Sequence, residues 1–155
     1  MARELPPARD AARRKRDVLE RLAGDEDAWV ATADAAGEPC LVPLSFVWHG
    51  GALVMTTRAA NPTAVNAAAS GRAVVSLGHT RDVVLIDARV EVVADGALGE
   101  AEGEAFVAKL AWDTRGRPGW VFLRFHPRAI RAWREVNELP GRQLMANGVW
   151  LVQGA

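Results

Sequence analysis

The sequence predicts an α+β fold that is mainly β, in which antiparallel strands close into a barrel with helices at its periphery. Three observations support this prediction. Six or more short apolar segments with the character of strands follow one another closely. Their connections are short turns, whereas parallel strands require long crossovers. Helical patterns occur at only three places, and closing the sheet into a barrel removes its exposed edges.

Composition and charge fit one soluble domain over residues 1–155, with no repeat or linker dividing it. The 19 basic and 19 acidic residues balance, which argues against a nucleic-acid-binding protein. No apolar run is long enough to span a membrane, and the N-terminus lacks the apolar core of a signal peptide. The single cysteine, Cys40, suits a reducing compartment, so we expect a cytoplasmic protein.

The first element is a helix over about residues 8–23. Val18, Leu19 and Leu22 form a short apolar stripe at helical spacing, and Gly24 ends the helix. A basic run at 13–16 precedes this stripe. Because Asp10, Asp17 and Glu20 flank the run and partly neutralise it, we interpret it as a solvated face, and contact with an anionic partner is the less favoured alternative.

Three strands and their turns come next. The predicted strands are Trp29–Ala33, Cys40–Trp48 and Ala52–Thr57. Residues 34–37 and 49–51 contain the glycines that tight turns with positive φ require. The three strands are therefore expected to be antiparallel neighbours.

The second half of the chain adds a fourth strand and a long fifth strand. These are Ala73–Leu77 and Asp82–Val93. The fifth alternates, and its inward face is predicted to carry Val84, Ile86, Ala88, Val90 and Val92. A helix over Leu98–Leu110 follows. Two closing strands, Trp120–Phe125 and Ala129–Arg134, are predicted on either side of His126-Pro127.

A short helix after the third strand has clear start and stop signals. Asn61 is a good N-cap, Pro62 suits the first helical position, and Gly71 suits the position after the end. The helix has about two turns and would not be stable in isolation. Its N-terminus is therefore expected just beyond the end of the third strand.

That helix start predicts an anion site, with phosphate as the ligand. Free backbone N–H groups and the positive end of the helix dipole would face Thr56, Thr57 and Arg58. Thr63 adds a hydroxyl in the first turn. A capped helix start without a ligand is the alternative. Neither a Walker loop nor a Rossmann fingerprint is present.

No catalytic side chain and no metal site are predicted. The three histidines, His49, His79 and His126, lack metal-ligand spacing with Cys40 or with one another, and no Ser/His/Asp triad pattern occurs. Trp133 differs from these residues because it shares the polar face of its strand with Arg131. We expect Trp133 to be covered by another element of the chain or by a partner.

The ordered set of these elements resembles the split β-barrel family related to pyridoxamine 5′-phosphate oxidase, which includes flavin-binding and deazaflavin-binding oxidoreductases. The resemblance spans most of Trp29 to Met145. It is carried in order by AWVATADAAGEPCLVPLSFVWHGGALVMTT, NPTAVNAAASGRAVVSLG, TRDVVLIDARVEVV and PRAIRAWREVNELPGRQLM. The resemblance implies an antiparallel split β-barrel of the FMN-binding type.

The resemblance also implies where a cofactor would lie. The isoalloxazine ring would lie against the second strand, at Val42, Pro43, Leu44 and Ser45. The phosphate would be held by Thr56, Thr57, Arg58, Asn61, Pro62, Thr63 and Asn66. Many family members place Lys or Arg at the helix start, where this chain has Pro62 and Thr63. Arg58 is therefore the cation of the predicted site.

Members of this family pair into homodimers, in which a C-terminal Trp and Arg approach the flavin of the neighbouring subunit. Trp133 and Arg142 occupy similar places, within an interface segment over about residues 129–155. The resemblance implies an oxidoreductase that uses FMN or the deazaflavin coenzyme F-420 to transfer hydride to or from a small organic substrate. Ser45 and nearby backbone would position the ring. The alternative is a noncatalytic flavin- or haem-binding or stress-related protein on the same barrel.

Overall fold

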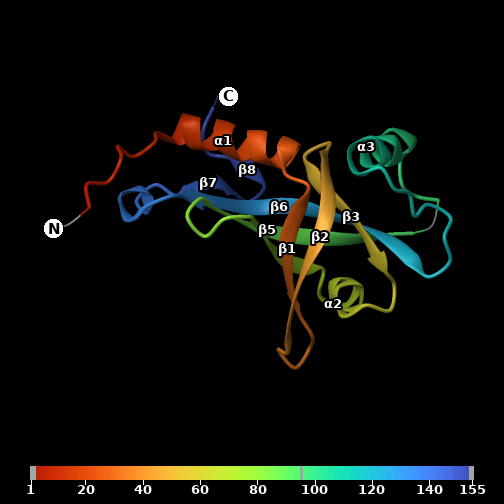
Figure 1. Cartoon of the computed structure of the whole chain (residues 1–155). Helices are drawn as coiled ribbons and strands as arrows, with labels where there is room; N and C mark the ends of the chain where they lie inside the picture. The colour runs from red at the N-terminus through yellow and green to blue at the C-terminus, as the bar shows by residue number, and fades with distance from the viewer. Residues whose placement is uncertain (1–2, 95, 154–155) are drawn as a thin grey trace.

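The computed structural model describes residues 3–94 and 96–153, which form one antiparallel sheet of eight strands with peripheral helices (Figure 1). The strand order is β3-β2-β1-β4-β5-β6-β7-β8, and pairing of β3 with β6 closes the first six into a barrel. The strands are Asp27–Ala33 (β1), Pro39–His49 (β2), Ala52–Arg58 (β3), Arg72–Leu77 (β4), Val83–Val93 (β5), Trp120–Trp133 (β6), Gln143–Ala146 (β7) and Val149–Trp150 (β8). The predicted fold class is confirmed.

The helices lie around the barrel, as predicted. They are Ala11–Gly24 (α1), Pro62–Ser70 (α2) and Glu100–Leu110 (α3), with a short 3-10 turn at Val136–Glu138 (η1). Figure 1 shows α1 across one end of the barrel, above β7 and β8, and α2 below the sheet on the opposite side. None of the described helices has the length and apolar character needed to cross a membrane.

The N-terminal helix begins three residues later than the predicted start at residue 8. Asp10 is its N-cap, and the Asp10 carboxylate accepts a hydrogen bond from the backbone N–H of Arg13 at 2.8 Å. Val18 and Leu22 from the predicted stripe are buried against the barrel. The cap, rather than the apolar stripe, therefore fixes where α1 starts.

The two predicted closing strands are one continuous strand, β6, which passes through His126-Pro127. The prediction of a break was wrong because a β-bulge accommodates the proline. Asp87 of β5 pairs with Ala129 and Ala88 pairs with Pro127, which leaves Arg128 as the extra residue. Pro127 has no N–H to donate, and the bulge allows the ladder to continue on both sides of it.

The predicted inward face of β5 is correct at four of its five positions. Val84, Ile86, Ala88 and Val90 are buried. Val92 is 37% exposed, because it lies at the open end of the barrel near α2. Val93 is buried instead, in a second apolar cluster with Phe106 of α3 and Phe122 of β6.

The barrel is split where β2 and β3 separate. The two strands pair from His49–Ala52 to Phe46–Met55. Beyond this point, residues 39–45 of β2 pair with β1, and residues 56–58 of β3 pair with β6. Helix α2 follows β3 and packs beside this gap with its Ala64 and Ala67 buried. The split is therefore bordered by β2, the end of β3 and the start of α2.

Candidate functional site

The split brings together three segments that the sequence assigned to a cofactor site. These are residues 42–45 of β2, the end of β3 and the first turn of α2. Cys40 Sγ lies 3.8 Å from Thr63 Oγ1, which joins β2 to α2. Asn61 donates from Nδ2 to Thr57 Oγ1 at 3.0 Å, which joins α2 to β3. The predicted ring-binding and phosphate-binding segments are thus neighbours in space.

The ring-binding segment of β2 has one apolar outer side. Val42 and Leu44 are half-buried and pack against the core. Pro43 is exposed and pairs across the sheet with Trp29, which is 46% exposed. Together with Leu41, which is 63% exposed, these residues form an apolar surface beside the split.

Ser45 already has a partner within the chain. Its hydroxyl donates to Asp27 Oδ1 at 2.6 Å, and the two residues face each other across the β1–β2 ladder. Because its hydroxyl hydrogen is used in this way, Ser45 can accept a hydrogen bond from a ligand but cannot donate one. Donation to a ligand at this position would come from backbone N–H groups. Sequence reasoning missed Asp27, because its pairing with Ser45 depends on a connection at residues 34–38 that is one residue longer than the predicted turn.

Three of the predicted phosphate-binding side chains are used inside the protein. Thr56 is 3% exposed, and its hydroxyl contacts Thr114 Oγ1 at 2.7 Å and the Val121 carbonyl at 2.9 Å. Thr63 is buried against β2, and the buried Asn66 donates to Thr32 Oγ1 at 3.1 Å. These contacts hold β3 and α2 in the barrel and take up part of the hydrogen-bonding capacity of Thr56, Thr63 and Asn66.

The start of α2 is open to an acceptor. Asn61 occupies the N-cap position, but its side chain makes no capping hydrogen bond and turns to Thr57 instead. Pro62, at the first helical position, has no N–H. The following N–H groups of the first turn have no side-chain cap within the described residues, and such groups attract anions. Because Thr57 accepts from Asn61, its own O–H can also donate.

Arg58 is the exposed cation beside this helix start. Its guanidinium lies over the ring of Trp120, with the central carbon 4.9 Å from the ring centroid. The two residues are paired across β3 and β6. Stacking on an aromatic face restricts a flexible guanidinium and leaves its N–H groups free to donate. Sequence reasoning missed Trp120, because no local signal reports that β3 pairs with β6.

Trp133 and Arg142 lie far from the split of their own chain. Arg58 pairs with Trp120 at one end of β6, and Trp133 is the last residue of the same strand. A strand of this length spans roughly 40 Å. Trp133 is half-buried opposite Val83, and Arg142 is exposed with Nη1 donating to the Leu139 carbonyl at 3.0 Å. One chain therefore does not bring Trp133 and Arg142 to Arg58.

The arrangement at the split can bind and orient a ligand. Within the described part of the chain, no group of three metal-ligating side chains is close enough to hold a metal ion. The split offers one cation, a hydroxyl, free N–H groups at a helix start and an apolar strand surface. These groups suit an elongated molecule with an anionic end and a flat apolar end.

The chain is similar to many solved structures of this fold, and 94 structure chains match it. An FAD-binding protein from Mesorhizobium loti is 18% identical with a TM-score of 0.64, and the match covers 81% of this chain and 93% of that one. HutZ, the haem storage protein from Vibrio cholerae, is 12% identical with a TM-score of 0.61, covering 87% and 98%. An F-420 reductase is 20% identical with a TM-score of 0.57, covering 72% and 93%.

No curated protein sequence matches the chain. The sequence profile of the family described as pyridoxamine 5′-phosphate oxidase matches residues 15–134, which include most of α1, the whole six-stranded barrel and Trp133. This match covers well over half of the sequence and confirms the resemblance that the ordered motifs indicated. The chain belongs to the pyridoxamine 5′-phosphate oxidase family.

Proposed function

We propose that the protein binds FMN or the deazaflavin coenzyme F-420 at the split between β2 and β3 and transfers hydride between this coenzyme and a small organic substrate. The observation that carries the proposal is the uncapped start of α2 beside Arg58. The family match supports it, and FAD-binding and F-420 reductase proteins share the fold. A bound flavin or deazaflavin would supply the hydride donor or acceptor.

Different residues of the split bind the phosphate and the ring of the coenzyme. Arg58, the Thr57 hydroxyl and the first-turn N–H groups of α2 hold the phosphate. The backbone of residues 42–45 lies along the ring, with Pro43 contributing apolar contact and keeping water away from that edge. The protein's part in the reaction is to position the ring and exclude water, which agrees with a site that needs no acid or base of its own.

The proposed functional unit is a homodimer. Trp133 and Arg142 reach the split only if they come from a second copy, because β6 separates them from Arg58 within one chain. The exposed apolar surface at Leu41 and Trp29 would be buried against a second copy. In a twofold pair the same patch serves both chains, so each dimer would contain two equivalent coenzyme sites.

Absorbance spectroscopy of the purified protein, before and after addition of FMN or F-420, tests coenzyme binding. We expect Arg58→Ala to weaken binding roughly tenfold to a hundredfold, since a charge-assisted contact contributes about 1.5–3 kcal/mol. Arg16→Ala, which removes an exposed arginine of α1, is the matched control and should bind as the wild type does. Equal coenzyme affinities for the two variants would rule out the split as the phosphate site.

A noncatalytic carrier of flavin or haem is the second candidate. Two observations favour it: HutZ has the same fold, and Thr56, Thr63 and Asn66 are committed to internal hydrogen bonds. Mixing the coenzyme-loaded protein with candidate oxidants and reductants separates the two functions. A ligand that binds but neither gains nor loses hydride with any of them would support the carrier.

A further inference from the structure

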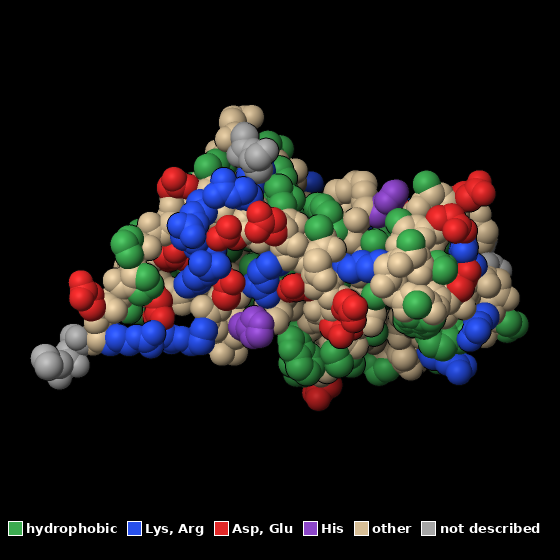
Figure 2. Space-filling model, turned by 45° about the horizontal axis from the view of Figure 1, so that its top comes forward, with side chains coloured by type: hydrophobic (Ala, Val, Ile, Leu, Met, Phe, Trp, Pro, Cys, Tyr) green, Lys and Arg blue, Asp and Glu red, His purple; other side chains and the backbone are tan. Residues whose placement is uncertain are grey.

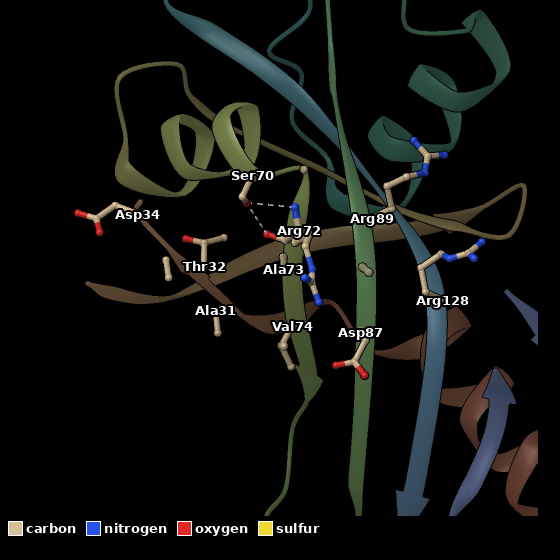
Figure 3. Close-up of a pocket in the computed structure, with 13 residues that line it drawn as sticks. Ala31, Thr32, Asp34, Ser70, Arg72, Ala73, Val74, Asp87, Arg89 and Arg128 are labelled. Carbon is tan, nitrogen blue, oxygen red and sulfur yellow. Dashed lines mark hydrogen bonds between the residues drawn. The ribbon is translucent and has the colours of Figure 1, made fainter. Parts of the chain in front are cut away.

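A groove of about 590 Å³ crosses the outer face of the barrel, apart from the split (Figure 3). It lies over β1, β4 and β5, between the start of the β1–β2 turn at Asp34 and the bulge residue Arg128 of β6. Ala31, Ala33 and Val74 form a floor of small apolar side chains. The charged residues that line it are Asp34, Arg72, Asp87, Arg89 and Arg128. The volume falls within the range of small-molecule sites.

Two of its arginines oppose each other in the sheet. Arg72 of β4 and Arg89 of β5 are directly paired, and both are exposed. Like charges at paired positions of an antiparallel ladder repel each other and destabilise the sheet. The bulge at Arg128 adds a third guanidinium on the neighbouring strand β6. In Figure 3, Arg72 lies along β4 over the groove, while Arg89 and Arg128 extend from β5 and β6.

The described acidic residues of the groove form no ion pair with these arginines. Asp34 Oδ1 accepts hydrogen bonds from the backbone N–H groups of Ala36 and Glu38, both at 2.9 Å. Asp87 lies 3.9 Å from the guanidinium of Arg131 on β6. Within the described residues, Arg72, Arg89 and Arg128 form no ion pair, whereas Arg9, Arg115 and Arg124 all pair with carboxylates of the chain.

We infer that this groove binds the phosphate monoester of a small organic molecule, at a site distinct from the coenzyme phosphate. A dianionic phosphate between Arg72 and Arg89 would convert their repulsion into two charge-assisted contacts, and the planar guanidinium matches the geometry of phosphate oxygens. The alanine and valine floor offers contact to a flat organic body next to the phosphate. Arg128 contributes a third positive charge at the β6 edge of the groove (Figure 3).

Adenosine monophosphate is a suitable probe, because it combines a phosphate monoester with a flat body. Isothermal titration at low ionic strength should detect its binding to the wild type, with weaker binding of inorganic phosphate and none of adenosine. Arg72→Gln and Arg89→Gln should each weaken binding by at least about tenfold. Arg16→Gln is the matched surface control and should leave binding unchanged.

Thermal unfolding gives a readout that does not depend on the coenzyme. Without ligand, Arg72→Gln should melt at a higher temperature than the wild type, because one repelling charge is gone. Phosphate should raise the melting temperature of the wild type more than chloride at equal ionic strength, and Arg72→Gln should reduce this difference whereas Arg16→Gln should not.

Several results would overturn the inference. One is equal binding of adenosine and adenosine monophosphate, and another is equal weakening by Arg72→Gln and Arg16→Gln. A third is loss of adenosine monophosphate binding in Arg58→Ala with full binding in Arg72→Gln, which would place the phosphate at the split. Because Arg58→Ala is otherwise expected to bind the probe normally, failure of this inference is distinguishable from failure of the proposed coenzyme site.

Discussion

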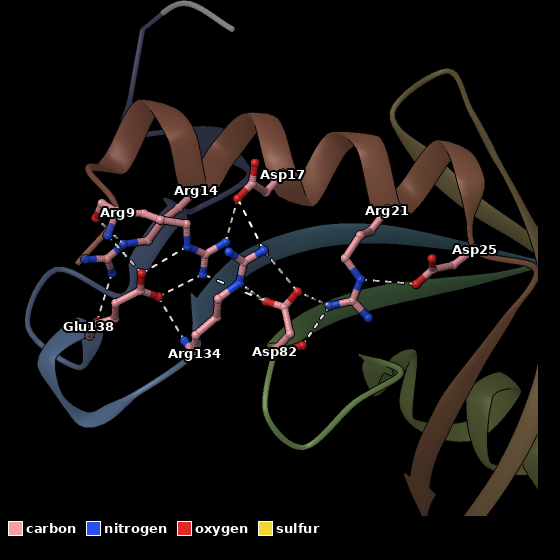
Figure 4. Close-up of polar contacts among 8 residues, drawn as sticks. All are labelled: Arg9, Arg14, Asp17, Arg21, Asp25, Asp82, Arg134 and Glu138. Carbon is pink, nitrogen blue, oxygen red and sulfur yellow. Dashed lines mark hydrogen bonds and ion pairs between the residues drawn. The ribbon is translucent and has the colours of Figure 1, made fainter. Parts of the chain in front are cut away.

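At the α1 end of the barrel, Arg9 and Glu138 are 6% and 3% exposed, and every oxygen of the Glu138 carboxylate has a donor (Figure 4). Arg9 contacts this carboxylate through Nε at 2.9 Å and Nη2 at 2.8 Å, and through its backbone N–H at 2.9 Å. The backbone N–H of Arg134 adds a bond at 2.8 Å. The carboxylate of Asp17 on α1 accepts a hydrogen bond from Arg9 Nη1 at 2.8 Å.

At the α2 end, charged and apolar groups are left open. Arg58 is exposed, the first turn of α2 lacks a side-chain cap, and Arg72 and Arg89 face each other. By contrast, acidic and basic side chains lie intermixed on the face that carries α1 (Figure 2). The comparison indicates that charge at the α1 end stabilises the fold, whereas Arg58, Arg72 and Arg89 at the α2 end have no carboxylate partner among the described residues.

The network at the α1 end also fixes the segment that leads to Arg142. Arg14 donates from Nη1 to the Glu138 carbonyl at 2.9 Å and from Nη2 to the Pro140 carbonyl at 3.4 Å. α1 therefore holds the connection between β6 and β7 against the barrel. This connection carries Arg142, which the proposed dimer directs to the split of the other copy.

Removing the buried carboxylate should have the largest effect. Glu138→Ala leaves Arg9 buried without its main partner and should lower the free energy of unfolding by about 3–5 kcal/mol. Chemical denaturation measures this loss. Arg58→Ala, at the α2 end, should change the free energy of unfolding by less than about 0.5 kcal/mol. If the two variants unfold at the same denaturant concentration, the contrast between the two ends is wrong.

Acid should reproduce part of this loss. The hydrogen bonds from Arg9 and the backbone lower the pKa of Glu138 from 4.5 to about 2. Because the folded-state pKa is depressed, the stabilisation is complete above about pH 5 and is lost as the pH falls from 4.5 toward 2. A shift of this size corresponds to at most about 3–4 kcal/mol.

Glu138→Gln isolates this contribution from other carboxylates, because the amide does not titrate in this range. The difference in free energy of unfolding between the wild type and Glu138→Gln should narrow as the pH is lowered from 5 to 3. Denaturant titrations at several pH values measure it. A difference that stays constant over this range would mean that Glu138 does not titrate with a depressed pKa.

Much of the fold could be predicted from the sequence because its signals are local. Alternating apolar residues gave most strand positions, and Asn61, Pro62 and Gly71 gave the bounds of α2. The break predicted at Pro127 was wrong, because a bulge depends on the partner strand and leaves no local mark. The inward position of Val92 was predicted from alternation alone, which does not report where the barrel wall ends.

The candidate site was less predictable, since its details depend on long-range pairing. The sequence placed Thr56 and Thr57 together, but only the folded chain shows that Thr56 bonds to Thr114 and to the Val121 carbonyl of β6, which are 58 and 65 positions away. The contact between Arg9 and Glu138 joins residues 129 positions apart, and neither residue type signals it. The polar residues of the candidate site could be identified from residue type alone. Their hydrogen-bond partners could not, because those partners are set by the folded structure.

The proposed dimer joins the α2 end of one copy to the α1 end of the other, and two substitutions test this with a smaller expected effect. Trp133→Ala should weaken both dimerisation and coenzyme binding, because a large half-buried aromatic would be lost from the interface. Arg142→Ala should weaken coenzyme binding about tenfold while leaving the dimer intact, since it removes one exposed charge near the ligand.

Light scattering combined with coenzyme titration measures both effects in the same samples. A mixed dimer sharpens the test, because a site built from two chains requires Arg58 from one copy and Arg142 from the other. Mixing Arg58→Ala with Arg142→Ala chains should therefore restore one intact site in each mixed dimer and leave the second site doubly damaged. If each site were built from Arg58 and Arg142 of the same chain, mixing the two variants would restore no intact site. A wild type that stays monomeric at tens of micromolar while binding coenzyme fully would contradict the dimer, and it would leave Trp133 and Arg142 without a role at the split.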